Sequence, residues 1–402
     1  MRRRLLVLAA LLLLGGCGHS EICDELSGIA PSRLLTTTTT TTIERRHADP
    51  RPTRLAYSDG SSLWNLDEHG NATEVGPSGL PVWSSDGRYL AWSTQDHDRN
   101  APPPKLNQPQ SWTIHILDTD RGRRAQYRGA ERPLNGDLFA VGERFVAPLS
   151  GRNNLGQDAT DFVTFDFEDV ENGTVASPIH PRFDLPRPTH EYDFSWASVQ
   201  GNDLYVVVTD TSTVYYRYNP QLWRVSVGGL AAPVQMKKKG DGFQNISMAP
   251  LAVSADNRYI VFTAGAKSGV CYHGAWPVLL RNADGTAQQI DGLPKHSGRA
   301  SHLVDSLQWT TADTFLLSLR IRPIDCNDTA LPTSEHLYRC TVVDGCVDTG
   351  YASQGASESR HGDLAYLEPY KDARRTNLVV RWRNGKMQRL DVATWGSFAW
   401  SP

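Results

Sequence analysis

Residues 81–94 read PVWSSDGRYLAWST, and they form the intact copy of a pattern that the two ends of the chain carry in halves. The C-terminal residues 398–402, FAWSP, match the first half of this pattern, and residues 54–57, RLAY, match the second half. Two terminal pieces that complete one repeat indicate a ring of repeats, in which the last strand pairs within the first unit. For a chain built of short strands, this arrangement predicts an all-β fold, a β-propeller closed by its C-terminal strand.

From residue 54 onward, short β-branched and aromatic strands alternate with tight turns that recur in register. Units begin with Val82-Trp83 before SSDG, Ala252-Val253 before SADN and Gln308-Trp309 before TTAD. Each unit holds four strands over about 50 residues, which is the size of a propeller blade. We predict seven blades; six is the alternative, because GASESRHG at 355–362 has little strand character. The predicted units are 54–76, 80–128, 134–177, 190–237, 248–290, 302–349 and 352–393.

The N-terminus carries an export signal. Arginines at 2–4 precede ten apolar residues at 5–14, a run too short to span a bilayer as a helix. The following residues, LGGC at 14–17, resemble the bacterial lipobox, which implies that Cys17 is acylated and becomes the mature N-terminus. We expect residues 1–16 to be a lipoprotein signal peptide; the alternative is an ordinary signal peptide with an incidental cysteine.

Residues 17–53 form the predicted link between the anchor and the propeller. They lack a usable hydrophobic period and include an unbroken threonine run at 36–42. Such a stretch cannot bury enough apolar surface to offset its ordering entropy, so it predicts a disordered tether. The predicted domains are therefore the signal peptide, this tether beginning at Cys17, and the propeller at 54–402.

Charge and composition favour an extracytoplasmic domain. Removal of residues 1–16 leaves 38 of the 41 Lys and Arg residues against 44 Asp and Glu residues. This net negative charge does not indicate the excess of Lys and Arg that nucleic-acid binding requires. We expect the protein to lie in the cell envelope, held by lipid on the extracytoplasmic side of a membrane.

Cysteine use agrees with export. Five cysteines remain besides Cys17, so an oxidising compartment leaves at least one unpaired, and Cys23 in the tether is the candidate. A three-residue turn at 343–345 would place Cys340 and Cys346 on one face of a hairpin, diagonally related, whereas a two-residue turn would separate them. Cys271 and Cys326 occupy equivalent connections of adjacent blades, and we expect a second disulfide there.

The segment WSSDGRYLAWS resembles the TolB-type and WD-like propeller repeats of bacterial envelope proteins, whose pattern is W-S-P-D-G-R-x-I-A-F. The match is close at residues 83–92, partial at 253–262 and split between the two termini. This resemblance implies a propeller that serves as a docking platform. The chain departs from TolB itself by lacking a preceding α/β domain, because residues 18–53 are too short and too polar.

Motifs for chemistry are absent from the sequence. There is no G-x-S-x-G nucleophile elbow, no phosphate-binding loop and no H-E-x-x-H, so we predict no catalytic residue, metal or cofactor. The polar segment 95–99, QDHDR, lies in a long connection and is most simply a solvated loop.

Long connections predict where binding occurs. Turns from first to second strand and from third to fourth strand are short, whereas second-to-third connections such as 95–110, 151–160 and 264–275 are long. Because strand direction alternates, the long connections emerge at one end of the disc. Aromatic residues on such connections offer flat contact area for a sugar, peptide or protein. The predicted contact residues are Tyr215, Tyr216, Tyr218, Tyr272, His273 and Trp276.

Two functions follow as hypotheses. The first is a lipid-anchored, non-catalytic binding or scaffold module with an envelope protein or glycan as partner. The second is an envelope hydrolase or lyase that acts on carbohydrate or lactone-like substrates at the centre of the ring. Fold alone does not decide between them. The absence of a periodic cluster of carboxylates and histidines favours the first.

Overall fold

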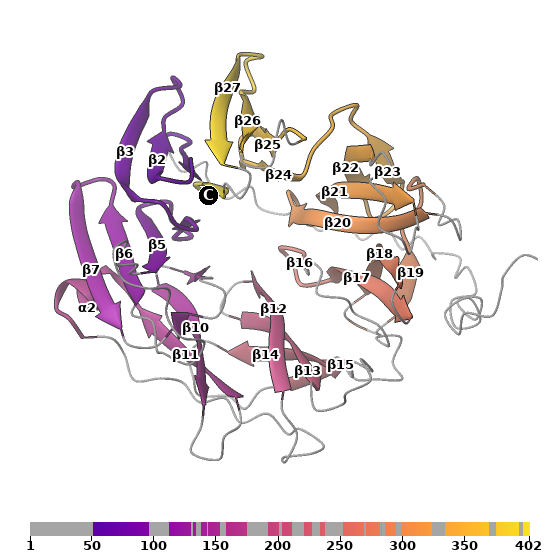
Figure 1. Ribbon diagram of the computed structural model, residues 1–402, viewed down its shortest axis with the longest axis horizontal. Coiled ribbons are helices and arrows are strands. Elements are labelled where there is room, and N and C mark those ends of the chain that lie inside the picture. The colour runs from indigo at the N-terminus through magenta and orange to yellow at the C-terminus, as the bar shows by residue number, and fades with distance from the viewer. Residues whose placement is uncertain are drawn as a thin grey trace, which may run out of the picture.

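The computed structural model describes most of the chain from residue 51 onward, and its regular structure is almost entirely β-strand (Figure 1). The described residues are 51–95, 112–129, 132–133, 138–142, 144–152, 158–174, 192–200, 203–210, 221–226, 234–237, 252–268, 271–281, 283, 286–294, 300–323, 334–369, 375–393 and 397–402.

Antiparallel sheets stand side by side around a common centre (Figure 1), which confirms the predicted all-β propeller. The described residues form seven four-stranded sheets. Blades 1 to 3 are β28 (Phe398–Trp400), β1 (Leu55–Ser58), β2 (Ser62–Leu66) and β3 (Ala72–Pro77); β4 (Val82–Trp83), β5 (Tyr89–Gln95), β6 (Trp112–Asp118) and β7 (Arg123–Gly129); and β8 (Arg132–Pro133), β9 (Phe139–Val141), β10 (Arg144–Arg152) and β11 (Asp158–Phe165).

The other four blades each take their strands consecutively from the chain. Blades 4 and 5 are β12 (Tyr192–Gln200), β13 (Asp203–Asp210), β14 (Gln221–Ser226) and β15 (Val234–Lys237), and β16 (Ala252–Val253), β17 (Tyr259–Ser268), β18 (Cys271–Arg281) and β19 (Ala287–Gln289). Blades 6 and 7 are β20 (Ala300–Trp309), β21 (Thr314–Pro323), β22 (Ser334–Thr341) and β23 (Gly345–Asp348), and β24 (Gly355–Glu358), β25 (Leu364–Leu367), β26 (Arg375–Arg381) and β27 (Met387–Ala393).

The two halves of the split motif meet in blade 1. Strand β28 pairs with β1 in the register Leu55↔Trp400 and Tyr57↔Phe398. Beyond these pairs, the Ser401 amide donates to the Arg54 carbonyl oxygen at 2.8 Å, and the Arg54 amide donates to Ser401 Oγ at 3.0 Å. Strands from opposite ends of the chain therefore share one sheet.

The serine and aspartate of the motif shape the turn after the inner strand in blades 2 and 5. In blade 2, the Tyr89 amide donates to Ser84 Oγ at 2.9 Å, and Ser84 Oγ donates to Asp86 Oδ1 at 2.5 Å. Gly87 has φ 69°, the positive φ that the turn requires. Blade 5 repeats the arrangement, since the Tyr259 amide donates to Ser254 Oγ at 3.0 Å. Local sequence thus fixes the turn in these two units.

The motif tryptophan joins neighbouring blades through its indole N–H. Trp83 donates to the Ala399 carbonyl oxygen at 3.0 Å, Trp309 to that of Ala252 at 3.1 Å, and Trp400 to that of Ser357 at 3.0 Å. Each acceptor stands on the innermost strand of the preceding blade, one residue before the equivalent of the tryptophan. We call this contact the tryptophan clasp.

Blade 7 carries Glu358 at the tryptophan position. Its carboxylate accepts two hydrogen bonds of 2.8 Å from the Arg339 guanidinium of blade 6. Gln308 of β20 completes the contact, because its side chain accepts from the Glu358 amide at 2.7 Å and donates to the Glu358 carbonyl oxygen at 3.2 Å. Blades 6 and 7 are thus joined by charged and amide groups at this position.

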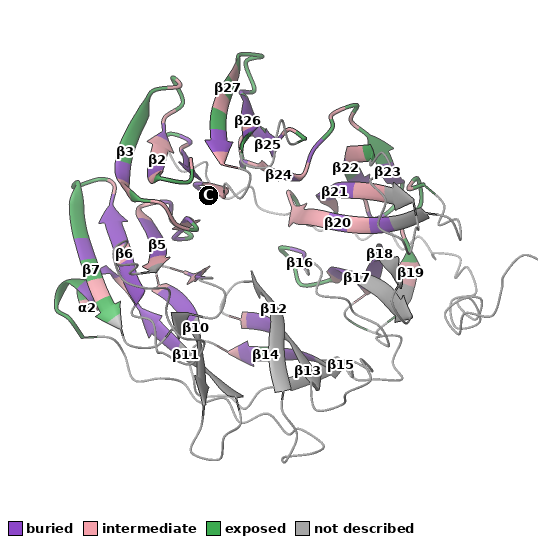
Figure 2. Ribbon diagram, viewed as in Figure 1, coloured by how far each residue is buried: buried purple, intermediate pink, exposed green. Residues whose placement is uncertain are grey.

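Apolar side chains fill the spaces between blades, and the middle strands are buried while the outer strands face solvent (Figure 2). Trp83 and Trp92 belong to the apolar cluster between blades 1 and 2. Between blades 2 and 3, Ile116 packs with Phe145 and Phe165, whose rings stack at 5.9 Å. Burial of large side chains contributes about 1.5–3 kcal/mol each, so these contacts dominate stability.

Blade 3 departs from the expected four-strand ladder over residues 134–177. Strands β8 and β9 both pair with β10, and after β11 the described chain turns into helix α2 (Phe167–Glu171). Asp166 caps this helix by accepting from the Asp169 amide at 2.8 Å. Phe167 stacks on Tyr89 of blade 2 at 5.7 Å, so the helix packs against the preceding blade.

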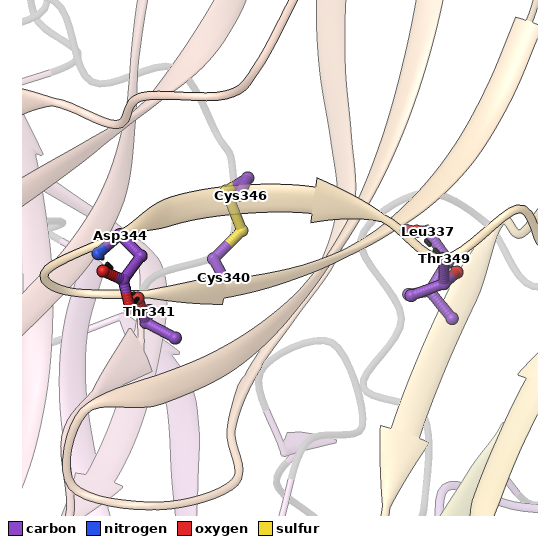
Figure 3. The surroundings of a disulfide bond; sticks show 6 residues. All are labelled: Leu337, Cys340, Thr341, Asp344, Cys346 and Thr349. Atoms are coloured by element: carbon purple, nitrogen blue, oxygen red, sulfur yellow. Dashed lines mark hydrogen bonds between the residues drawn. A yellow bond between two sulfur atoms is a disulfide. The ribbon is translucent and has the colours of Figure 1, made fainter.

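A disulfide joins Cys340 to Cys346 across the hairpin of β22 and β23 (Figure 3), which confirms the predicted pairing. The two cysteines are direct cross-strand partners, so the diagonal relation expected from a turn at 343–345 is wrong. Gly345 pairs with Thr341 and belongs to the strand, so the turn spans residues 342–344. The Cys346 amide donates to the Asp291 carbonyl oxygen at 2.8 Å, which ties this hairpin to blade 5.

Candidate functional site

The two ends of the disc differ in their connections. First-to-second turns such as residues 84–88 and third-to-fourth turns such as 342–344 lie at one end, which we call the tight-turn end. Second-to-third connections leave from the opposite end, because adjacent strands are antiparallel. The predicted binding residues were assigned to this opposite end.

The structure changes the setting of some of these residues. Tyr272, His273 and Trp276 lie on strand β18, so the loop expected at 264–275 is wrong. Strands β17 and β18 remain paired as far as Ser268↔Cys271. The loop expected at 151–160 is likewise shortened, because β10 and β11 pair as far as Arg152↔Asp158.

The remaining predicted residues fall elsewhere in the chain. Tyr215, Tyr216 and Tyr218 lie outside the described residues, as do Cys17 and Cys326. The expected contacts of all six aromatic residues, the acylation and the second disulfide stay predictions.

A buried polar cluster lies toward the opposite end, where blades 6 and 7 meet. Arg320 of β21 donates to the Asp305 carboxylate of β20 through Nη2 at 2.8 Å and Nε at 3.2 Å. Glu335 of β22 lies beside the same guanidinium, with Oε1 3.6 Å from Nε. Gln354, which precedes β24, donates from Nε2 to Glu335 Oε1 at 2.7 Å. We call these four side chains the acceptor cluster.

A β-bulge positions Asp305. The pairing of β20 with β21 shifts between Val304 and Ser306, so Asp305 is the extra residue. A bulge redirects a side chain that regular alternation would place elsewhere. Ser306, the next residue, accepts through Oγ from the backbone amide of Ala356 at 3.0 Å, and so links this strand to β24. The bulge thus lies at the junction of the two blades.

Two oxygens of the acceptor cluster have no hydrogen-bond donor among the described residues. They are Glu335 Oε2 and Gln354 Oε1, and both atoms are buried. The Glu335 side chain is only 7% exposed, against 11% for Asp305 and 13% for Arg320. A buried acceptor without a donor costs about 1–3 kcal/mol, and more when it is charged. These two oxygens therefore distinguish the cluster from the surface ion pairs of the protein.

Charge compensation within the acceptor cluster is uneven. Arg320 donates hydrogen bonds from Nε and Nη2, and both go to the Asp305 carboxylate. Glu335 lies beyond that distance from the guanidinium and accepts its hydrogen bond from the neutral amide of Gln354. Buried carboxylates are ordinarily paired with a cation. The cluster can therefore accept hydrogen bonds and positive charge at Glu335.

Sequence patterns did not identify the acceptor cluster. Its members come from three strands and one connection, and no pair of them stands closer than 15 residues in the chain. The one available signal was Asp305 itself, a carboxylate in the middle of the strand-like segment SHLVDSLQW at 301–309.

In the described part of the chain, no group of three or more His, Cys, Asp or Glu side chains could hold a metal ion. None of its helices has the length and apolar character needed to cross a membrane.

No protein-family model matches the chain, and no curated protein matches it in sequence. Solved structures do match it. The propeller domain of the Trilobed protease from Pyrococcus furiosus aligns with 84% of this chain and 92% of its own length, at 13% identity and TM-score 0.51. The periplasmic gluconolactonase of Pseudomonas aeruginosa aligns with 88% of this chain and 100% of its own, at 13% identity and TM-score 0.50.

A third match is an acylaminoacyl peptidase of Pyrococcus horikoshii, with 82% of this chain aligned at 14% identity and TM-score 0.52. This chain covers 47% of that enzyme, about half its length. The likeness is one of fold. The Pyrococcus furiosus domain is described as having an open velcro topology, whereas here β28 pairs with β1.

Proposed function

We propose that the protein is a lipid-anchored extracytoplasmic β-propeller of the bacterial cell envelope, related in role to TolB-type propellers, that acts as a non-catalytic binding or scaffold module. Its partners are the membrane, through acylated Cys17, and an envelope protein or glycan that meets the end of the disc opposite the tight turns. Nucleic acid is not a partner. The disulfide between Cys340 and Cys346 supports an oxidising compartment.

The observation that carries this proposal is where the chain enters the propeller. Arg51 donates to the Asp86 carbonyl oxygen at 2.5 Å and lies 3.4 Å from the Asp86 carboxylate and 4.0 Å from that of Asp120. Asp86 and Asp120 belong to turns at the tight-turn end. A tether that joins here supports an orientation in which this end faces the membrane. The acceptor cluster lies toward the other end, which is left free for a partner.

Photo-crosslinking in cells tests this orientation with two positions on one hairpin. A photoreactive residue replaces Ser334, at the start of β22, or Asp344, in the turn that follows β22; both are exposed. We expect a protein or glycan adduct from position 334 and none from position 344. The parallel variant Cys17→Ser should release the protein from membranes. Adducts from 344 alone, or unchanged membrane association of Cys17→Ser, would contradict the proposal.

A second candidate is the envelope hydrolase or lyase for carbohydrate or lactone-like substrates. The observation that favours it is the pair of carboxylates, Asp305 and Glu335, held around one guanidinium beside the innermost strand of blade 6. A lactone-hydrolysis assay of the full chain tests it. Turnover that Asp305→Asn abolishes without loss of folding would favour the enzyme, and absence of turnover would favour the binding module.

A further inference from the structure

Glu335 and Gln354 present two buried acceptors on one hydrogen-bonded pair. The Gln354 amide turns its NH2 group toward Glu335, since the opposite orientation would bring two oxygens together, so its own oxygen points elsewhere. Glu335 Oε2 is the other free oxygen of the pair. A single compact donor that reached both oxygens would complete the acceptor cluster.

We propose that the acceptor cluster is a binding site for a primary ammonium group, supplied by a small amine or by a lysine side chain of the partner. An ammonium group is compact, carries one positive charge and has three N–H donors. It therefore offers donors to Glu335 Oε2 and Gln354 Oε1 and supplies a second positive charge to a cluster in which one guanidinium serves two carboxylates. The inference rests on the proposed binding role and names the chemistry that this end of the disc recognises.

Other occupants satisfy the cluster less completely. A water molecule donates two hydrogen bonds but leaves two carboxylates, Asp305 and Glu335, against the single guanidinium of Arg320, and buried charge that is not fully compensated is costly. A calcium ion takes six to eight oxygen ligands, and among the described residues no group of three metal-binding side chains exists. A guanidinium already occupies the cluster as Arg320, which is committed to Asp305.

The acceptor cluster lies close to the surface of the protein. Asp305 and Arg320 retain 11% and 13% exposure, so the group lies just beneath the surface. Gln354 is anchored to blade 7, because its backbone N–H donates to the Leu367 carbonyl oxygen at 3.0 Å. Glu335 comes from blade 6. An ammonium group bound between them would also bridge the two blades.

Thermal unfolding of the full chain with methylammonium chloride tests the proposal. Tetramethylammonium chloride at the same concentration is the control, because it carries the charge without any N–H donor. We expect methylammonium to raise Tm in a concentration-dependent way beyond the control, since a ligand that binds the folded state stabilises it. An acetylated, amidated Gly-Lys-Gly peptide is the second probe, and a larger shift with the peptide than with methylammonium would indicate a lysine as the natural source.

Variants locate the effect. Glu335→Gln keeps the shape and removes the charge, and it should weaken methylammonium binding by roughly 10- to 100-fold, the range for one charge-assisted hydrogen bond. Gln354→Met removes the amide oxygen and should weaken it as well. Asp391→Asn is the matched control, because Asp391 is 56% exposed on β27 and outside the cluster.

Three outcomes overturn the proposal: equal shifts with both salts, shifts that survive in Glu335→Gln, or no shift with methylammonium. The last outcome would assign the cluster to structure or to bound water. Because this test uses the isolated protein, it is separate from crosslinking in cells. A negative amine titration together with adducts from position 334 would remove the ammonium site and leave the binding module in place.

Discussion

The tryptophan clasp makes a quantitative prediction about inter-blade stability. In Trp83→Phe, Trp309→Phe and Trp400→Phe, a carbonyl oxygen of the neighbouring blade loses an indole donor that lies 3.0–3.1 Å away. Leaving a buried acceptor without its donor costs about 1–3 kcal/mol. Each variant also loses the packing of part of an indole ring, so the total cost exceeds the hydrogen-bond contribution.

Two other tryptophans separate these contributions. Trp92 and Trp382 are 2% and 3% exposed, and among the described residues their indole N–H groups have no acceptor. Trp92→Phe and Trp382→Phe therefore remove the same ring atoms from a buried site without breaking a hydrogen bond. We expect the clasp variants to be less stable than these controls by about 1–3 kcal/mol.

Equilibrium urea unfolding followed by far-ultraviolet circular dichroism measures the difference, because that signal does not depend on the tryptophans that are replaced. The midpoint should fall furthest for the clasp variants, with an unchanged slope. Equal losses of stability in both groups would refute the argument, since they would show that the indole N–H contacts add nothing to packing.

Three other predictions address single contacts. Gly292→Ala should destabilise the protein by about 2–4 kcal/mol, measured by urea unfolding, because a β-carbon there overlaps the Cys346 carbonyl oxygen. In the control Gly122→Ala, the β-carbon meets nothing within 4 Å, so this variant should cost only the strain of its positive φ, about 1–2 kcal/mol. Loss of the disulfide in a Cys340→Ser and Cys346→Ser double variant should lower stability by about 2 kcal/mol, measured against the oxidised protein, because the loop that it closes is short. Burial, aided by the Asp59 carboxylate, raises the pKa of Tyr57 to about 12 from 10.0. Between pH 10 and 12 the unfolded state therefore loses a proton that the folded state keeps. The free energy of unfolding should fall as the pH rises through this range, and it should fall less steeply in Tyr57→Phe.

The architecture could be predicted from the sequence because its signals are local and repeated. The Ser–Asp turn is written into five consecutive residues of each good copy, and the same hydrogen bonds recur at Ser84 and Ser254. The split motif specified which strands pair, and β28 pairs with β1. The weak segment at 355–362 contains strand β24, because pairing with β25 and burial of Gly355 and Ala356 supply what propensity lacks.

The details that escaped prediction depend on partners distant in sequence. Gly269 and Pro277 bound a segment that resembles a loop, yet β18 begins at Cys271 because β17 continues opposite it through a bulge at Gly265–Lys267. Pairing across the hairpin overrides the local breakers. The cysteines at 340 and 346 were paired correctly, but their direct opposition depends on Gly345 joining the strand.

At the junction of blades 6 and 7 the motif position carries a charged group. At Trp83 and Trp400 the motif position joins blades by an indole, whereas blade 7 carries Glu358, held by Arg339 and Gln308. The acceptor cluster lies at the same junction, toward the opposite end of the disc. In a repeat protein the stabilising contacts recur, so a unit that exchanges a recurring indole for charged groups loses the packing of the indole ring. Departures from local consistency are expected at functional sites. The coincidence of both departures at one interface is therefore the structural argument for binding at blades 6 and 7.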